Sequence, residues 1–142
     1  MTTAPLPTAD CRPPTDSDTL AAFAAHFDIQ LSGFPAQLLK DVVAAFATLP
    51  YENITKIIKR AECGTPEKSR RYPEEVISDH ISWGTGGTCF SLTSALRHLV
   101  RSIGFKAEYI LADRRYGQDT HCALLLWING IRSKTGTGYA IP

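Results

Sequence analysis

The segment that follows the glycine-rich run WGTGGTCF constrains the fold of this chain most strongly. Apolar side chains recur there at the spacing of one helix face, namely Leu92, Ala95, Leu96, Leu99, Val100 and Ile103. Cys89 lies three residues before Leu92 and continues the stripe into the first turn of the predicted helix. Gly104 is suited to end this helix, because glycine readily adopts the left-handed conformation of a helix C-terminus. We expect the apolar face of the helix to pack on a sheet formed by the residues that follow.

Two apolar segments after this helix predict strands, KAEYILAD at 106–113 and HCALLLWI at 121–128. The polar segment DRRYGQDT between them is expected to be a loop. Asn129-Gly130 is a dipeptide favoured in two-residue hairpin turns, so the segment IRSKTGTGY is predicted to return as a third strand. The strands are therefore expected to form a small antiparallel sheet.

The first half of the chain shows helical periodicity and no strand alternation. Pro35 and Pro73 stand where the second and third helices are expected to begin, a position that suits the fixed φ of proline. The segment YENITKIIKRAE is compatible with either an irregular turn or a short helix. The predicted helices cover 18–27, 35–49 and 73–82.

Length and composition indicate one globular domain. The chain has 142 residues, of which 44% are hydrophobic and 20% are charged. Residues 1–17 are rich in Pro, Thr and Asp, which predicts a disordered leader. We therefore expect an α/β protein, more specifically an α+β fold of the cysteine-proteinase type. A helical subdomain at 18–83 would be followed, at 84–142, by a Cys-bearing helix on a small, incomplete antiparallel sheet.

The charge pattern and the hydropathy pattern exclude two classes of partner. The formal net charge is +1, and no run of Lys and Arg forms a phosphate-binding stripe, which argues against nucleic acid. No stretch approaches the roughly eighteen apolar residues of a membrane span, and the first residues lack the apolar core of a secretory signal. The expectation is a soluble, cytoplasmic protein without a membrane partner.

The four cysteines are widely and unequally spaced. Without a Cys-x-x-Cys pair, neither a metal site nor a redox couple is expected, and no bound cofactor is predicted. A chain of this size without an export signal is expected to keep most of its thiols reduced. Cys11 and Cys63 are therefore interpreted as incidental thiols.

Cys89 is the candidate nucleophile. It is expected in the first turn of a helix, where unpaired backbone N–H groups and the helix dipole stabilise a thiolate. Gly86, Gly87 and Thr88 precede it, and such a loop lets a carbonyl group approach the backbone and offers N–H donors for an oxyanion. The alternative is a small buried thiol that fills space beside a turn.

His121 is the candidate general base. It opens the predicted strand at 121–128, after the polar residues GQDT, where an imidazole ring can face a cleft. A thiol nucleophile needs a group that removes its proton and later protonates the leaving group, and imidazole does both near neutral pH. A structural histidine beside an apolar strand is the alternative, but the pairing with Cys89 favours the catalytic interpretation.

A third group that orients the imidazole is missing from its expected place. With Asn129-Gly130 as the turn, His121 would face Gly138 and lie diagonally across from Gly136, so an Asp or Asn is expected at one of these two positions. Asp113 and Asp119 lie in the preceding loop, where solvated carboxylates are the expected interpretation.

Three segments resemble the arylamine N-acetyltransferases and, more widely, the transglutaminase-like thiol enzymes. LPYENITK is similar to the Pro-Phe-Glu-Asn segment of the family, GTGGTCFSLTSALRHLVRSIGFKAEYILADR to its Gly-Gly-x-Cys helix and next strand, and THCALLLWING to its His strand. The family has Arg where this chain has Thr85, an acidic residue at Ser91, and its triad Asp at Gly136. The resemblance also implies that the chain ends at Pro142 before the rest of the barrel and the lid domain.

The resemblance implies an acyltransferase with an acyl-thioester on Cys89, with His121 as general base. Acetyl-coenzyme A or another acyl thioester would be the donor, and a small-molecule amine the acceptor. The transglutaminase-like alternative would form amides from a carrier-bound acyl group or a peptide. A third possibility is a catalytically impaired remnant that acts as a binding module, because the triad Asp is absent at Gly136. A second copy of the chain could complete the sheet.

Overall fold

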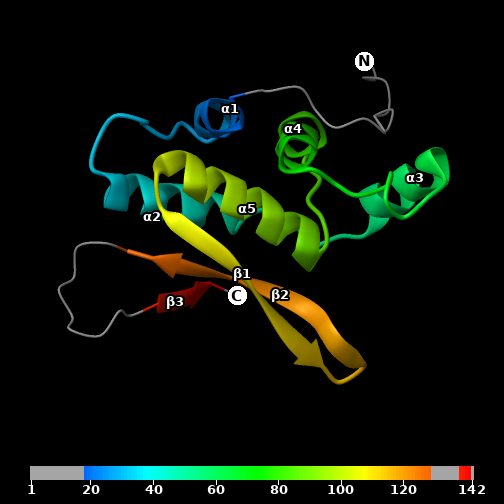
Figure 1. Ribbon diagram of the computed structural model, residues 1–142. Helices are drawn as coiled ribbons and strands as arrows, with labels where there is room; N and C mark the ends of the chain where they lie inside the picture. The colour runs from blue at the N-terminus through cyan, green and yellow to red at the C-terminus, as the bar shows by residue number, and fades with distance from the viewer. Residues whose placement is uncertain (1–17, 129–137, 142) are drawn as a thin grey trace, which may run out of the picture.

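The computed structural model describes residues 18–128 and 138–141, and it is a helical layer on a small sheet (Figure 1). The helices described are α1 (Thr19–His26), α2 (Pro35–Phe46), α3 (Ile54–Cys63), α4 (Pro73–Trp83) and α5 (Cys89–Ile103). They precede the strands β1 (Lys106–Arg114), β2 (Gly117–Trp127) and β3 (Gly138–Ile141), which form one antiparallel sheet in the order β1-β2-β3. The expected α/β fold class is confirmed.

Local sequence signals set most helix ends. The side chain of Asp18 caps α1 by accepting a hydrogen bond from the backbone N–H of Ala21 at 3.0 Å. Pro35 and Pro73 are the first residues of α2 and α4, as their fixed φ predicts. Gly104, with φ +107°, follows the last residue of α5. The strongly periodic stripe after Cys89 therefore forms the predicted helix with the predicted end.

The ambiguous segment after Tyr51 is a helix. A carboxylate oxygen of Glu52 accepts a hydrogen bond from the backbone N–H of Thr55 at 3.0 Å, which satisfies a free donor in the first turn of α3. Gly64, with φ +78°, ends the helix. Three isoleucines of α3 stay largely exposed, at Ile54, Ile57 and Ile58. Helix capping rather than an apolar face therefore defines α3.

One hydrophobic core joins the helices to the sheet. In Figure 1, α5 lies between the sheet and the pair α1 and α4, and it packs on α2, α4, β1 and β2. Its stripe is buried and meets apolar side chains from the other layers. The core includes Phe23, Val42, Val76, Leu99, Val100, Leu124 and Leu126. The helical segment and the sheet segment therefore share one core.

The segment DRRYGQDT is mostly strand, which corrects the expected loop at 113–120. β1 extends to Arg114 and β2 begins at Gly117, so the two strands form a tight hairpin. The register shifts between Ala112 and Arg114, and Asp119 has a φ of +52°. This end of the hairpin projects beyond the core, so its side chains are exposed and polar. For this reason the sequence here lacks the apolar residues that usually indicate a strand.

The predicted register between the second and third strands is wrong. Leu124 pairs with Ile141 and Trp127 with Gly138, so the connection is longer than two residues. The dipeptide Asn129-Gly130 lies outside the described residues, as does 1–17. The predicted register rested on the turn preference of one dipeptide. The sequence did not show which residues of the third strand would face the core, and this choice sets the register.

No helix in the described ranges is both long and apolar enough to cross a membrane.

Candidate functional site

A close backbone contact places the loop in front of Cys89. The N–H of Gly87 donates to the carbonyl oxygen of Pro50 at 3.2 Å, and the N–H of Glu52 donates to the carbonyl oxygen of Gly87 at 3.0 Å. Tyr51 and Gly87 form a parallel bridge. A Cβ at Gly86 would lie only 1.8 Å from the carbonyl oxygen of Pro50. The loop can pass this segment only because no side chain stands at Gly86.

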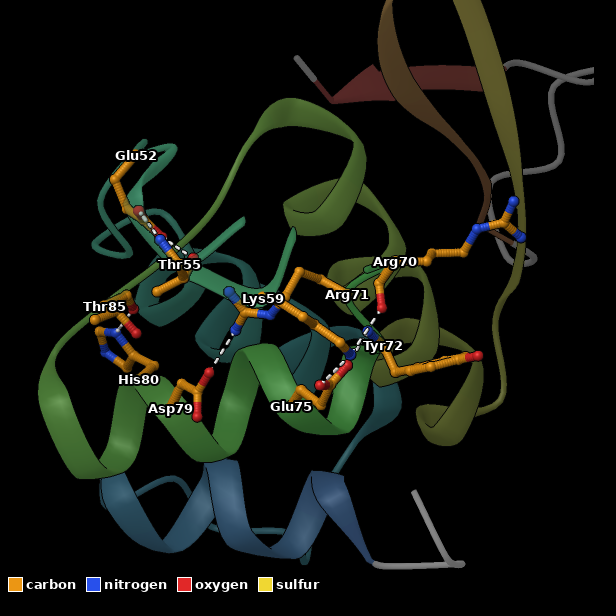
Figure 2. Close-up of polar contacts among 10 residues, drawn as sticks. All are labelled: Glu52, Thr55, Lys59, Arg70, Arg71, Tyr72, Glu75, Asp79, His80 and Thr85. Carbon is orange, nitrogen blue, oxygen red and sulfur yellow. Dashed lines mark hydrogen bonds and ion pairs between the residues drawn. The ribbon is translucent and has the colours of Figure 1, made fainter. Parts of the chain in front are cut away.

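A histidine on α4 holds the start of the same loop. Nδ1 of His80 donates to the carbonyl oxygen of Thr85 at 2.8 Å, because a carbonyl can only accept (Figure 2). The His80 ring stacks on Phe27 with a centroid distance of 5.7 Å. The hydroxyl of Thr85 is buried and has no hydrogen-bond partner. The loop is thus fixed from α4 on one side and from the 50–52 segment on the other.

Cys89 is the first residue of α5 and is half-buried. The N-cap residue, Thr88, makes no side-chain hydrogen bond that caps the helix. Of the three residues of the predicted oxyanion loop, Gly87 has its backbone N–H already bonded to the carbonyl oxygen of Pro50. The free N–H groups of the first turn of α5 and the helix dipole favour a negative charge near Cys89.

Cys122 is the residue of β2 that faces Cys89, and sequence reasoning missed it. Cys122 is buried and shares a sheet face with Leu124 and Leu126, because alternate residues of a strand point to the same side. Burial raises the pKa of the Cys122 thiol, a hydrogen bond with Thr93 lowers it, and contact with the Cys89 thiol raises it further. Residues 122–127 are apolar at every position, so the sequence carries no alternation that could have identified Cys122 as the inward-facing residue.

His121 lies on the opposite face of the sheet from Cys122, since the two are adjacent in a strand. Its Nδ1 accepts a hydrogen bond from Nη2 of Arg114 at 2.8 Å, because guanidinium has no acceptor. Within the described residues no hydrogen bond joins His121 to Cys89. The structure therefore brings Cys89 together with Cys122, and His121 together with Arg114.

Among the residues that it describes, the structure identifies none in the place expected for the group that orients the imidazole of His121. Gly136 lies outside the described residues, and Gly138 faces Trp127 rather than His121, contrary to the predicted register. Asp113 and Asp119 are both exposed, as expected for solvated carboxylates. Their contact is local, because the N–H of Asp119 donates to a carboxylate oxygen of Asp113 at 2.9 Å.

A cleft of about 860 Å³ opens beside the cysteine pair. Cys122, Thr88 and Ser91 line it near the start of α5. Residues of α3 and of the segment 66–71, several of them basic, also line it. This volume is in the range of small-molecule sites in proteins.

A buried ion-pair cluster fixes α3 and the 66–71 segment against α4 (Figure 2). Nζ of Lys59, which is 2% exposed, pairs with Glu75 and donates to the carbonyl oxygen of Arg70 at 2.9 Å. Nη2 of Arg71 donates to Asp79 at 2.6 Å, while Nη1 of Arg71 is buried without a partner. Burial raises the pKa of the Asp79 carboxyl, against the opposing effect of Arg71.

Cys63 is disulfide-bonded, which corrects the expectation of an incidental reduced thiol. The error arose because unequal cysteine spacing carries no information about which cysteines meet in the fold. Among the described residues, no group of His, Cys, Asp and Glu has the arrangement of a metal site.

Comparison with solved structures decides the fold. The chain has the fold of arylamine N-acetyltransferase C from Bacillus anthracis. The two superpose with a TM-score of 0.58 at 16% sequence identity, over 81% of this chain. The match covers 46% of the arylamine N-acetyltransferase, so this chain spans about half of that protein's length. No protein-family model and no curated relative matches the sequence. At this identity, the likeness to the arylamine N-acetyltransferase concerns the fold.

Proposed function

We propose that the protein is a thiol acyltransferase of the arylamine N-acetyltransferase type, with Cys89 as nucleophile. The observation that carries the proposal is the position of Cys89 at the uncapped start of α5, behind a loop that two backbone hydrogen bonds fix, in a chain with this fold. Cysteine at a helix N-terminus has the local field that favours a thiolate. The acyl donor would be acetyl-coenzyme A or another acyl thioester, and the acceptor an amine.

The proposed reaction has two steps. In the first, the Cys89 sulfur gives its proton to His121 and attacks the donor carbonyl carbon, so a new C–S bond forms and the donor thiol leaves with the proton from His121. In the second, the amine nitrogen attacks the acyl-thioester carbon and gives its proton to His121. The C–S bond to Cys89 breaks, the amide leaves, and His121 returns the proton to sulfur.

The role of His121 requires a local change in β2. Its ring lies on the face of the sheet that turns away from α5, whereas its neighbour Cys122 faces the nucleophile. A shift of one residue exchanges the two faces of a strand. The register irregularity between Ala112 and Arg114 lies opposite this position and is a place where such a shift can be absorbed. Substrate binding would have to favour the shifted form.

Transfer of label tests the nucleophile. The protein is incubated with acetyl-coenzyme A that carries a radiolabelled acetyl group, and the labelled residue is identified by peptide mapping. We expect label on Cys89, none in Cys89→Ala, and retained label in Cys122→Ser. Label on Cys122 in the parent protein, or equal label in Cys89→Ala, would contradict the proposal.

The pH dependence of alkylation tests the base. Cys89 alkylation by iodoacetamide is followed against pH in Cys122→Ser, so that only one of the paired thiols reacts. If His121 deprotonates the thiol, His121→Ala moves the midpoint of the profile upward, whereas Arg115→Ala, an exposed residue in the same hairpin, leaves it in place. Identical profiles for the two variants would remove His121 from the mechanism.

A second candidate is an impaired member of the fold that binds a ligand without turnover. The pairing of Cys89 with Cys122, and of His121 with Arg114, favours it, because a nucleophile without its base reacts slowly. In this case acetyl-coenzyme A leaves no label while iodoacetamide still modifies Cys89. A transglutaminase-like enzyme would instead be labelled by a peptide or carrier-bound acyl group.

A further inference from the structure

Four basic side chains gather on one side of the cleft beside Cys122. Lys56 and Arg60 lie one turn apart on α3, and Arg70 and Arg71 come from the segment that leads to α4. No carboxylate lines the cleft. In the part of the chain that the structure describes, Lys56, Arg60 and Arg70 have no ion-pair partner. The cleft therefore holds positive charge that the described protein does not neutralise.

The two arginines of the segment that leads to α4 point in opposite directions (Figure 2). The side chain of Arg71 is 4% exposed and bonds Asp79 through Nη2 only. Its Nη1 is buried without any hydrogen-bond partner, although a buried unpaired donor is costly. In Figure 2 the Arg70 side chain leaves the cluster toward the strands, away from Arg71. Of these two arginines, Arg70 is therefore the one that is free to meet a ligand in the cleft, whereas Arg71 belongs to the buried ion pair with Asp79.

The rest of the cleft wall is apolar and aromatic. Phe90, Tyr109 and Leu111 line it and are 47%, 46% and 52% exposed. Exposed large apolar side chains that gather in a concave site are typical of ligand pockets. The cleft thus combines a cationic wall with an apolar one.

We propose that this cleft binds a small phosphorylated molecule with an apolar body. Lys56, Arg60 and Arg70 would hold the phosphate. Phe90, Tyr109 and Leu111 would cover the apolar body. A phosphate monoester carries about two negative charges and three acceptor oxygens near neutral pH. It therefore suits a site with several cations better than a ligand with one carboxylate group does. The proposal does not depend on thiol chemistry at Cys89.

Binding of phenyl phosphate to the 142-residue chain, measured by isothermal titration calorimetry, tests the proposal. Inorganic phosphate supplies the anion without the apolar body, and benzoate supplies the body with a single-charge carboxylate. We expect phenyl phosphate to bind at least about tenfold more tightly than either. Benzoate binding as tightly as phenyl phosphate would overturn the phosphate assignment, and inorganic phosphate binding as tightly would overturn the role of the apolar wall.

Charge reversal locates the site. Arg60→Glu is expected to weaken phenyl phosphate binding by about tenfold or more, whereas Lys40→Glu, the same charge change on the exposed face of α2, changes it less than about twofold. Arg70→Gln is the second variant, in case Arg60→Glu does not fold, and circular dichroism checks each variant. Weakening no greater than that of Lys40→Glu in the folded variants would overturn the proposal, as would no binding at about 10 mM phenyl phosphate.

Cys89→Ala separates this inference from the proposed function. The variant is expected to lose acetyl label and to bind phenyl phosphate as the parent does. Loss of binding in Cys89→Ala with an intact fold would overturn the independence of the cleft from the thiol site.

Discussion

At the scale of single residues, Cys122 rather than its neighbour His121 contacts the candidate nucleophile. Chemistry makes His121 the natural partner of a thiol nucleophile, yet the alternation of β2 turns Cys122 toward Cys89. Sequence proximity alone does not distinguish adjacent strand residues, because a shift of one residue reverses their faces. The identity of the candidate nucleophile was readable from its place after Gly-Gly, but its contact partner was not.

The buried thiol of Cys122 predicts a pH-dependent stability. Burial holds its pKa above the ordinary value of 9.0, so the thiol of the unfolded chain ionises first. The stabilisation is present below the unfolded pKa and is lost as the pH rises through the folded pKa. We expect the free energy of unfolding to fall more steeply above about pH 9 in the parent than in Cys122→Ala, measured by urea denaturation at roughly pH 7 to 10.5.

The two proteins are compared by how steeply the free energy of unfolding changes with pH, and not by its absolute value. A cavity left by the missing sulfur lowers the whole Cys122→Ala curve and does not change its dependence on pH. Parallel curves for the two proteins would contradict the prediction.

The glycines before Cys89 predict a specific pattern of rescue. A Cβ at Gly87 would lie 2.3 Å from Oγ of Ser91, a side-chain atom, whereas a Cβ at Gly86 would meet the backbone oxygen of Pro50. We expect Gly86→Ala to cost about 3 kcal/mol and Gly87→Ala about 1 to 2 kcal/mol in free energy of unfolding, measured by chemical denaturation. Ser91→Ala should restore stability only in combination with Gly87→Ala, so rescue of Gly86→Ala by Ser91→Ala would refute this account.

At the scale of elements, α3 depends on polar rather than apolar contacts. All three of its isoleucines are exposed, while Lys59 is buried and joined to Glu75 of α4. A helix with an exposed apolar face gains little from burial, so its attachment rests on the paired charge and the hydrogen bond from Lys59 to the backbone of Arg70. This attachment also sets the position of the basic wall of the cleft.

Removal of one buried charge should therefore be costly. Lys59→Ala leaves Glu75 without its partner in a partly buried site, and we expect a loss of about 3 kcal/mol in free energy of unfolding by urea denaturation. Lys56→Ala, an exposed position one turn earlier on α3, is the matched control and should change it by less than about 0.5 kcal/mol. Equal effects for the two variants would show that the buried pair does not hold α3.

At the scale of the whole molecule, α5 joins two segments that the sequence separates. Its apolar face meets the sheet through Leu124 and Leu126, and the helical layer through Val42 and Val76. Because one core is shared, the helices and the strands should unfold together. The boundary expected near residue 83 is thus a change of secondary structure within a continuous core.

A substitution in the sheet should therefore unfold the helices. Leu124→Ala, at a position that is 1% exposed, is expected to cost about 3 kcal/mol. Loss of far-ultraviolet circular dichroism and of tryptophan fluorescence should follow one shifted transition. Leu111→Ala, at a 52% exposed position on the same sheet, should cost less than about 1 kcal/mol. Separate transitions for the two signals would show independent units.

The sequence by itself determined the features that depend on near neighbours in the chain. The stripe of α5, its end at Gly104 and the first-turn prolines depend on contacts within a few residues, so local spacing predicts them. The position of Cys89 at a helix start follows from the same local rules. These features were predicted with the bounds, or nearly the bounds, that the structure shows.

Only the tertiary structure decided which distant groups meet. Contacts between segments far apart in the sequence set the register of β3, the face that β2 turns to α5, and the cleft between α3 and β1. Such contacts follow from how one shared core is filled, and a shift of a single residue changes them without changing the local pattern. For this reason Cys122 and the basic cleft emerged only from the fold.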